Sequence, residues 1–254
     1  MPTSGLFSGQ AARKEGRIAT GPGACRPPLA LYVHIPWCIR KCPYCDFNSH
    51  SLRDTLPETA YVDTLLRDLD LELVSLEPEV QPLVSVFIGG GTPSLLSGAA
   101  MTRLLAGIRQ RLPLAPATEI TLEANPGTAD SANFAQYREA GINRLSLGVQ
   151  SFHEATLQAL GRIHGPEEAR QAVRLARQAG FANLNLDLMY GLPRQDLTQA
   201  REDLREALAL DPEHLSYYQL TLEPHTPFHA APPPLPDDDL SADMQLQGHE
   251  LLAS

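Results

Sequence analysis

The sequence predicts an α/β protein whose parallel strands form a partial (β/α)6 barrel. Short apolar runs rich in branched side chains alternate with segments of helical periodicity, which is the pattern of a parallel sheet with helices outside it. Glycine and proline clusters separate the two kinds of segment. About six strand-helix units fit into the chain, fewer than the eight that close a barrel, so we expect a barrel that is open along one side.

The first unit begins with a buried strand, Leu31 to Ile35, which Pro36 ends. The next helix is expected from Thr55 to about Glu77, because Thr55 and Glu58 have the spacing of a capping box. The further predicted strands are 83–88, 119–122, 144–149, 184–189 and 215–222, and the further predicted helices are 94–112, a short helix with Phe134 and Tyr137 that stops at Gly141, 165–180 and 197–210.

The predicted barrel occupies residues 29–223, and the remaining segments are assigned by composition. Residues 1–28 are rich in glycine, alanine, proline and arginine and are expected to be a disordered arm. Residues 224–236 are proline-rich and predict a linker. Residues 237–254 predict a helix without a C-terminal glycine, which we interpret as the start of a truncated C-terminal domain.

Composition excludes several classes of protein. With 43% apolar and 20% charged residues in 254, the chain is of the ordinary globular type. A formal net charge of −10 argues against a partner such as nucleic acid or an anionic membrane. No apolar run reaches the ~20 residues of a membrane span, and no signal-peptide core is present. Four cysteines, three of them clustered, do not form a disulfide framework, so a cytoplasmic location is expected.

The three clustered cysteines, Cys38, Cys42 and Cys45, follow the first strand with the spacing C-x3-C-x2-C. A structural zinc ion takes four closed ligands, and the fourth cysteine, Cys25, lies upstream in a segment rich in proline and glycine. A 4Fe-4S cluster accepts three thiolates and leaves one iron open to a small molecule. The spacing therefore predicts such a cluster in preference to zinc or to uncommitted thiols.

The sequence GGGTP follows the second strand, at the strand end where barrels carry their sites. Glycines at 89–91 would let a ligand approach the backbone and would offer it unblocked N–H and C=O groups. A plain tight turn is the alternative. We favour ligand contact, because the cysteine loop lies on the same face.

Polar side chains follow the next three strands. Glu123 and Asp187 can accept hydrogen bonds from an amine or from ribose hydroxyls, as acidic residues do in dinucleotide sites, or they can pair with a nearby arginine. Gln150 and Arg162 are donors suited to a carboxylate or a ribose. The strand ends EANP, GVQSF, DLMYGLP and LTLEP are expected to converge with the cysteines on one mouth.

Beyond the cysteine loop, several motifs together resemble the HemN/HemW branch of the radical S-adenosylmethionine (SAM) proteins. They are IPWCIRKCPYCDF, FIGGGTPS, EANP, NRLSLGVQSF, LGRIH, NLDLMYGLPRQ and LSYYQLTLEPHTPF. The resemblance implies a partial radical-SAM barrel with a 4Fe-4S cluster on Cys38, Cys42 and Cys45. It further implies that SAM is held by Tyr32, Tyr44, Gly90, Gly91, Thr92, Glu123, Gln150, Arg162 and Asp187.

The residue at position 47 separates the two types in this branch. HemN-type proteins, which are oxygen-independent coproporphyrinogen dehydrogenases, carry a fourth cysteine two residues after the third, where this chain has Phe47. The run CDFNS resembles the HemW type instead, which implies a heme chaperone with heme as cargo, an electron donor, and acceptor proteins such as respiratory enzymes. A dehydrogenase is the alternative.

The sequence does not single out a heme ligand. Its eight histidines are scattered, and a lone histidine is more often structural than an axial ligand. The H-N-x-x-Y-W motif that the family carries in its C-terminal region is missing. A third interpretation is therefore a fragment that keeps only cluster and cofactor binding.

Overall fold

Six parallel strands form the main sheet of the computed structural model, which describes residues 27–75, 81–129 and 131–253. The strands lie in the order in which they occur in the chain: β1 (Leu29–Ile35), β4 (Leu83–Gly90), β5 (Leu114–Ala124), β6 (Arg144–Gln150), β7 (Leu184–Tyr190) and β8 (His214–Gln219). Because β1 and β8 are the two ends of this order and do not pair with each other, the barrel is open on one side. The predicted α/β partial barrel is confirmed.

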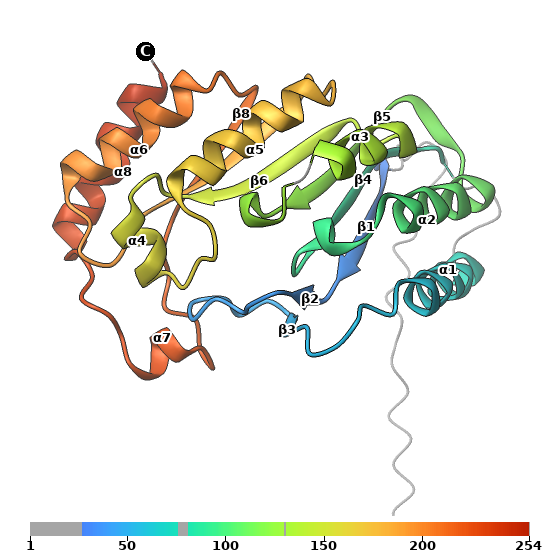
Figure 1. Cartoon of the computed structure of the whole chain (residues 1–254), viewed down its shortest axis with the longest axis horizontal. Coiled ribbons are helices and arrows are strands. Elements are labelled where there is room, and N and C mark those ends of the chain that lie inside the picture. The colour runs from blue at the N-terminus through green and yellow to red at the C-terminus, as the bar shows by residue number, and fades with distance from the viewer. Residues whose placement is uncertain (1–26, 76–80, 130, 254) are drawn as a thin grey trace, which may run out of the picture.

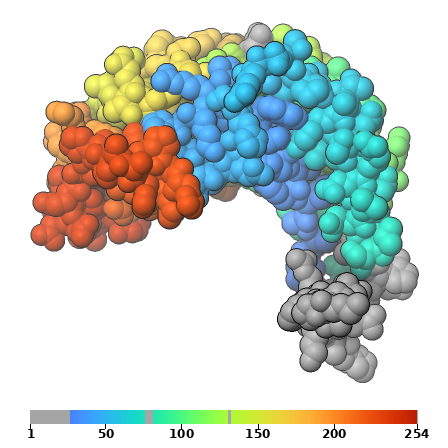
Figure 2. All heavy atoms as spheres, turned by 90° about the horizontal axis from the view of Figure 1, so that it is seen from below, coloured from blue at the N-terminus to red at the C-terminus, as the bar shows by residue number. Residues whose placement is uncertain are grey.

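Helices cover the outer face of the sheet, and the whole has the shape of an arch (Figures 1 and 2). They are α1 (Glu58–Ser75), α2 (Gly98–Arg111), α3 (Ser131–Ala140), α5 (Pro166–Gln178) and α6 (Leu197–Ala209). The main hydrophobic core lies between these helices and the strands. Figure 2 shows the hollowed side of the arch, with α1 toward one end and α8 (Asp238–Leu252) toward the other.

Strict alternation along the strands gives the sheet one apolar and one polar face. In β6, Leu145, Leu147 and Val149 are fully buried against the helices, whereas Ser146 and Gln150 point to the opposite side. The inner face carries these polar side chains, and it is this face that lines the cavity described below.

Several short elements were not predicted. They are β2 (Trp37–Cys38), β3 (His50–Ser51), the 3-10 turns η1 (Pro93–Leu95) and η2 (Pro126–Thr128), and the helices α4 (Glu154–Ala159) and α7 (Pro227–Ala230). The helix predicted at 94–112 is divided into η1 and α2, because the Ser97 side chain caps the N-terminus of α2. α7 falls inside the segment that composition assigned to a linker.

The predicted capping box at the start of α1 is wrong. The Glu58 N–H donates to the Leu56 carbonyl, and the Glu58 carboxylate accepts hydrogen bonds from the Ser97 N–H and hydroxyl. Glu58 therefore joins the N-termini of α1 and α2 instead of closing its own first turn.

Two predictions concern segments at the ends of the chain. The predicted arm at 1–28 and Cys25 lie almost wholly outside the described residues. α8 packs on α6 and β7, and its Met244 is 1% exposed. The division of the chain at residue 237 stays a prediction.

Candidate functional site

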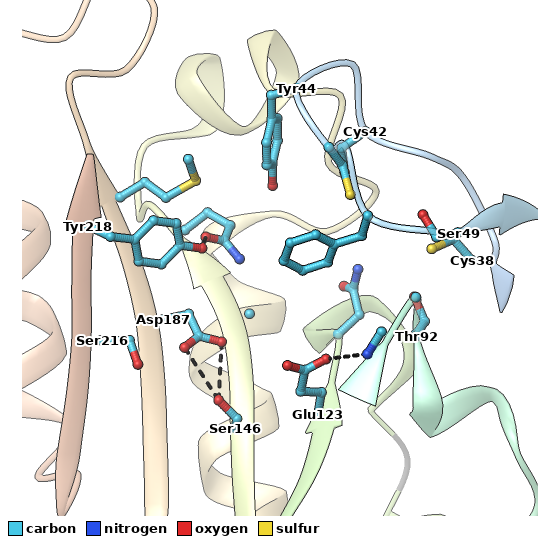
Figure 3. Close-up of a pocket in the computed structure, with 18 of the residues that line it drawn as sticks. Cys38, Cys42, Tyr44, Ser49, Thr92, Glu123, Ser146, Asp187, Ser216 and Tyr218 are labelled. Atoms are coloured by element: carbon cyan, nitrogen blue, oxygen red, sulfur yellow. Dashed lines mark hydrogen bonds between the residues drawn. The ribbon is translucent and has the colours of Figure 1, made fainter. Parts of the chain in front are cut away.

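A cavity of about 730 Å³ lies at the carboxyl ends of the strands, under the cysteine loop (Figure 3). It brings together every predicted site residue except Tyr32, which lies 56% exposed near the β1 edge. The Phe87 ring stacks on Tyr32 and does line the cavity. Lining residues that the sequence did not single out include Ser49, Phe87, Ser146, Asn185, Ser216 and Tyr218.

The cysteine loop is closed by its own backbone. β2 and β3 pair in parallel, the His50 N–H donates to the Pro36 carbonyl, and the Leu52 N–H donates to the Cys38 carbonyl. The Lys41 ammonium donates to the carbonyls of Phe47 and Ser49 across the loop. These bonds hold three free thiols on one short segment above the cavity.

The donor set of this loop suits an iron-sulfur cluster. Three soft thiolates are available, and each would bind a different iron of a cubane. The buried Ser49 hydroxyl has no hydrogen-bond partner among the described residues. It lies near Cys45: burial raises the pKa of that thiol, and the Ser49 hydroxyl partly offsets the increase. An orphaned donor beside a thiol is what a cluster sulfur would satisfy. No three His, Cys, Asp or Glu side chains of the described residues converge as a site for one metal ion.

Arg162 connects the loop to the sheet. Its Nη1 group donates to the Cys42 sulfur at 3.7 Å, and its Nη2 group donates to the Gly148 carbonyl at 2.7 Å. Its Nε–H is buried at the cavity without a partner among the described residues. One buried hydrogen-bond donor of the arginine is therefore free to bind a ligand.

The glycine segment after β4 does not offer the open N–H groups that we expected. The Gly90 N–H donates to Glu123 Oε2 at 3.0 Å, and those of Gly91 and Thr92 donate to the carbonyls of Ile35 and Trp37. A side chain at Gly91 would place its Cβ 2.6 Å from the Trp37 carbonyl oxygen. Close approach of the β1–β2 segment therefore accounts for this glycine without a ligand.

Two carboxyl groups face the cavity, those of Glu123 on β5 and Asp187 on β7 (Figure 3). Burial raises the pKa of Glu123 to about 7, opposed by the Gly90 N–H and reinforced by Asp187. Burial also raises the pKa of Asp187, although Ser146 and Asn185 donate hydrogen bonds to it and the nearby Ser216 hydroxyl opposes the rise. No arginine of the described residues forms an ion pair with either carboxyl group, although the charge of Arg144 lowers the pKa of Asp187. Arg144 lies by Glu119, and Arg162 lies by Cys42.

Gln150 enters the cavity from the last position of β6. Its backbone has a φ of 69°, and its Oε1 accepts a hydrogen bond from the Tyr218 hydroxyl at 2.8 Å. The amide nitrogen of this side chain is left for a ligand. None of the eight histidines lines the cavity.

A partial (β/α)6 barrel with three cysteines on a loop at its mouth defines the radical SAM class of fold. The profile of the Radical SAM superfamily matches residues 32–207, and the chain belongs to this superfamily. Membership implies a 4Fe-4S cluster and SAM.

The chain is similar to curated proteins named heme chaperone HemW. It is 57% identical to the one from Escherichia coli over 228 residues, which cover 90% of this chain and 60% of that protein. It is 52% identical to the one from Haemophilus influenzae, with 89% and 60% covered. The chain thus spans about 60% of the length of these relatives.

Among solved structures, coproporphyrinogen III oxidase (HemN) from Escherichia coli, described as a radical SAM enzyme, matches with a TM-score of 0.80 and 29% identity. The match covers 89% of this chain and 52% of that one. Within the described residues, no helix is both long and apolar enough to cross a membrane.

Proposed function

We propose that this protein is a radical-SAM heme chaperone, which binds a 4Fe-4S cluster, SAM and heme and delivers the heme to acceptor proteins in the cytoplasm. The observation that carries the proposal is the 57% identity to a protein named heme chaperone HemW. Phe47, which lines the cavity where HemN-type proteins are expected to have a fourth cysteine, supports the same choice. Respiratory enzymes are the expected acceptors.

In this proposal Cys38, Cys42 and Cys45 ligate the cluster, and the Ser49 hydroxyl and the Arg162 guanidinium donate hydrogen bonds to its thiolates. When bound and reduced, the cluster supplies the electron that cleaves SAM. The protein's part is to hold both groups and to limit the access of water and oxygen.

The carboxylates would recognise the positive and hydroxyl groups of SAM. Glu123 and Asp187 can accept from its amine and ribose, Arg162 can donate to its carboxylate, and Gln150 can donate through its side-chain amide. Tyr44 and the segment Gly90 to Thr92 would contribute contact surface. Tyr32 would act from the rim through Phe87, because it does not reach the cavity.

A second function is favoured by the structural match to HemN: oxidative decarboxylation of coproporphyrinogen III. The residue at position 47 argues against it, since the fourth cysteine of that type is replaced by phenylalanine.

One set of assays on anaerobically reconstituted protein separates these functions. About four irons per chain are expected, and a Cys42→Ala variant should lose them. Heme titration and a coproporphyrinogen turnover assay then follow on the same sample. Heme binding without turnover supports the chaperone, a vinyl product supports the dehydrogenase, and iron-free, zinc-loaded protein contradicts the cluster.

A further inference from the structure

Asp203 is a buried acid outside the predicted site. It lies in the middle of α6 and is 1% exposed. Burial raises the pKa of its carboxyl to about 6. A carboxyl group is seldom buried this deeply without a specific set of donors, so its partners indicate what it does.

Its first partners are in the turn that follows β6. The Phe152 N–H donates to Oδ1 of Asp203 at 2.6 Å, and the Ser151 hydroxyl donates to Oδ2 at 2.9 Å. The Ser151 oxygen also accepts from the His153 N–H at 3.1 Å, and the His153 ring lies 3.8 Å from the carboxylate. One acid thus fixes three consecutive residues of this turn.

Its next partner belongs to the turn that follows β7. The Gln195 side-chain N–H donates to Oδ2 of Asp203 at 3.3 Å, and the Gln195 side-chain oxygen Oε1 accepts from the Leu192 N–H at 3.1 Å. Gln195 is itself buried. The carboxylate therefore joins the exits of two adjacent strands, the segments GVQSF and YGLPRQ, which are separated by 37 residues in the sequence.

The residue before this turn is strained. Gln150 has a φ of 69°, in the left-handed region that non-glycine residues rarely adopt, and the register of β6 against β7 shifts between Leu147 and Gln150. Such a backbone persists only where its surroundings determine it. The hydrogen bonds from Ser151 and Phe152 to Asp203 hold the two residues that follow Gln150 and so keep its backbone in this conformation.

We propose that Asp203 is a positioning residue that fixes the turns after β6 and β7 and thereby holds the Gln150 side chain in the cavity, where SAM binds. Asp203 does not line the cavity, so it acts through the turn and not by contact with the ligand. This inference rests on the proposed function for the identity of the ligand, but the fixing of the turn does not depend on it.

The test is a double-mutant cycle between Asp203→Asn and Gln150→Ala, with SAM affinity measured by anaerobic equilibrium dialysis on reconstituted protein. Asp203→Asn is expected to weaken SAM binding about tenfold in the native background and by less than twofold when Gln150 is already alanine. Arg205→Gln is the control, because Arg205 is an exposed side chain of the same helix and does not line the cavity. Equal weakening in both backgrounds, or none in the native one, overturns the proposal.

A second measurement needs neither the cluster nor SAM. Hydrogen exchange of the amides at 150–153 in iron-free protein should speed up about tenfold or more in Asp203→Asn and less in Ser151→Ala, which keeps the Phe152 bond. Unchanged exchange in both variants overturns the proposal, even if they fold normally. If wild-type protein binds no SAM but exchange is still faster in Asp203→Asn, the proposed function is contradicted and the role of Asp203 is supported.

Discussion

Ser49 illustrates how one buried hydroxyl can report on a ligand. Its side chain is 2% exposed and faces the cysteine sulfurs without a partner in place among the described residues (Figure 3). A buried donor left unsatisfied costs about 1–3 kcal/mol. Binding of a cluster would relieve that cost, so Ser49 should influence the electronic properties of the cluster more than the fold.

The Ser49→Ala variant is predicted to keep its iron but to have a lower reduction potential, by on the order of 60 mV, which corresponds to ~1.4 kcal/mol for one electron. The sign follows because an O–H donor stabilises the more negative, reduced cluster, and the variant loses it. A potentiometric titration followed by electron paramagnetic resonance measures the shift. Ser51→Ala, on the same loop, is the control; equal potentials in all three proteins would contradict the prediction.

Glu123 makes the stability of the protein depend on pH. Its folded-state pKa of about 7 is above the ordinary value, so the folded state holds a proton that the unfolded chain releases first, and stability should fall as pH rises from about 4.5 to 7. Glu123→Gln should remove up to ~3 kcal/mol of this fall. The free energy of unfolding in urea, measured for iron-free protein at pH 5 and pH 8, tests the prediction, with the exposed Glu72→Gln as control. The prediction is refuted if the free energy of unfolding of Glu123→Gln falls with pH as much as that of wild type.

At the scale of elements, α7 and the cysteine loop form one unit. The Phe228 N–H donates to the Pro43 carbonyl, and the centre of the Phe228 ring lies 6.3 Å from that of the Tyr44 ring. Pro43 and Tyr44 are the two residues between the second and third cysteines. Phe228 is also part of a small core with Leu160, Met189, Leu192 and Leu220. The four-residue helix therefore anchors the cysteine loop.

Phe228→Ala is predicted to loosen that anchor. Loss of the ring costs ~3–5 kcal/mol where the surroundings cannot collapse, and here the loss is confined to the small core and the loop. The amides of Cys42, Tyr44 and Cys45 should exchange faster in iron-free protein, and the reconstituted cluster should bleach faster in air. Phe228→Leu should recover most of both properties and His229→Ala should change neither; slow exchange in Phe228→Ala would count against the anchor.

The sequence predicted the long elements better than the short ones, for a physical reason. Helical periodicity and β-branched runs identify strands and helices that are long enough to repeat their pattern, as in β6 and α5. α7 has no repeat to detect: proline content indicated a linker, and a single phenylalanine makes the contact. The Glu58 cap was missed because its partner, Ser97, lies on another helix.

At the scale of the molecule, an apolar core lies between the sheet and its outer helices, and a polar surface lies inside the arch. α8 extends the outer layer at the β8 end, where Met244 is buried with Tyr190 and Ala200. α8 is therefore packed on the barrel.

Met244→Ala should destabilise the whole barrel by ~2–4 kcal/mol, because α8 shares a core with α6 and β7. A thermal melt should show a single transition at a lower temperature. The exposed Leu246→Ala on the same helix should change it little. Two separate transitions, with the upper one unchanged, would instead favour the predicted boundary at residue 237.

The site was predictable as far as parallel strands place their carboxyl ends together. That argument brought the cysteines, Glu123, Gln150 and Asp187 to one cavity. It could not find Asp203, because an acid on an amphipathic helix is normally solvated and its partners lie in turns far along the chain. Ser146 and Asn185 could have been found, since the alternation in RLSLGVQ and LNLDLM places them on the same face as Gln150 and Asp187.

The N–H groups of Gly90, Gly91 and Thr92 are already used by the fold. A ligand in this cavity must therefore be recognised chiefly by side chains. A single substitution replaces a side chain, whereas it leaves backbone N–H groups in place. Relatives that share this barrel can thus acquire new ligands one residue at a time while β4 and the glycines after it stay the same.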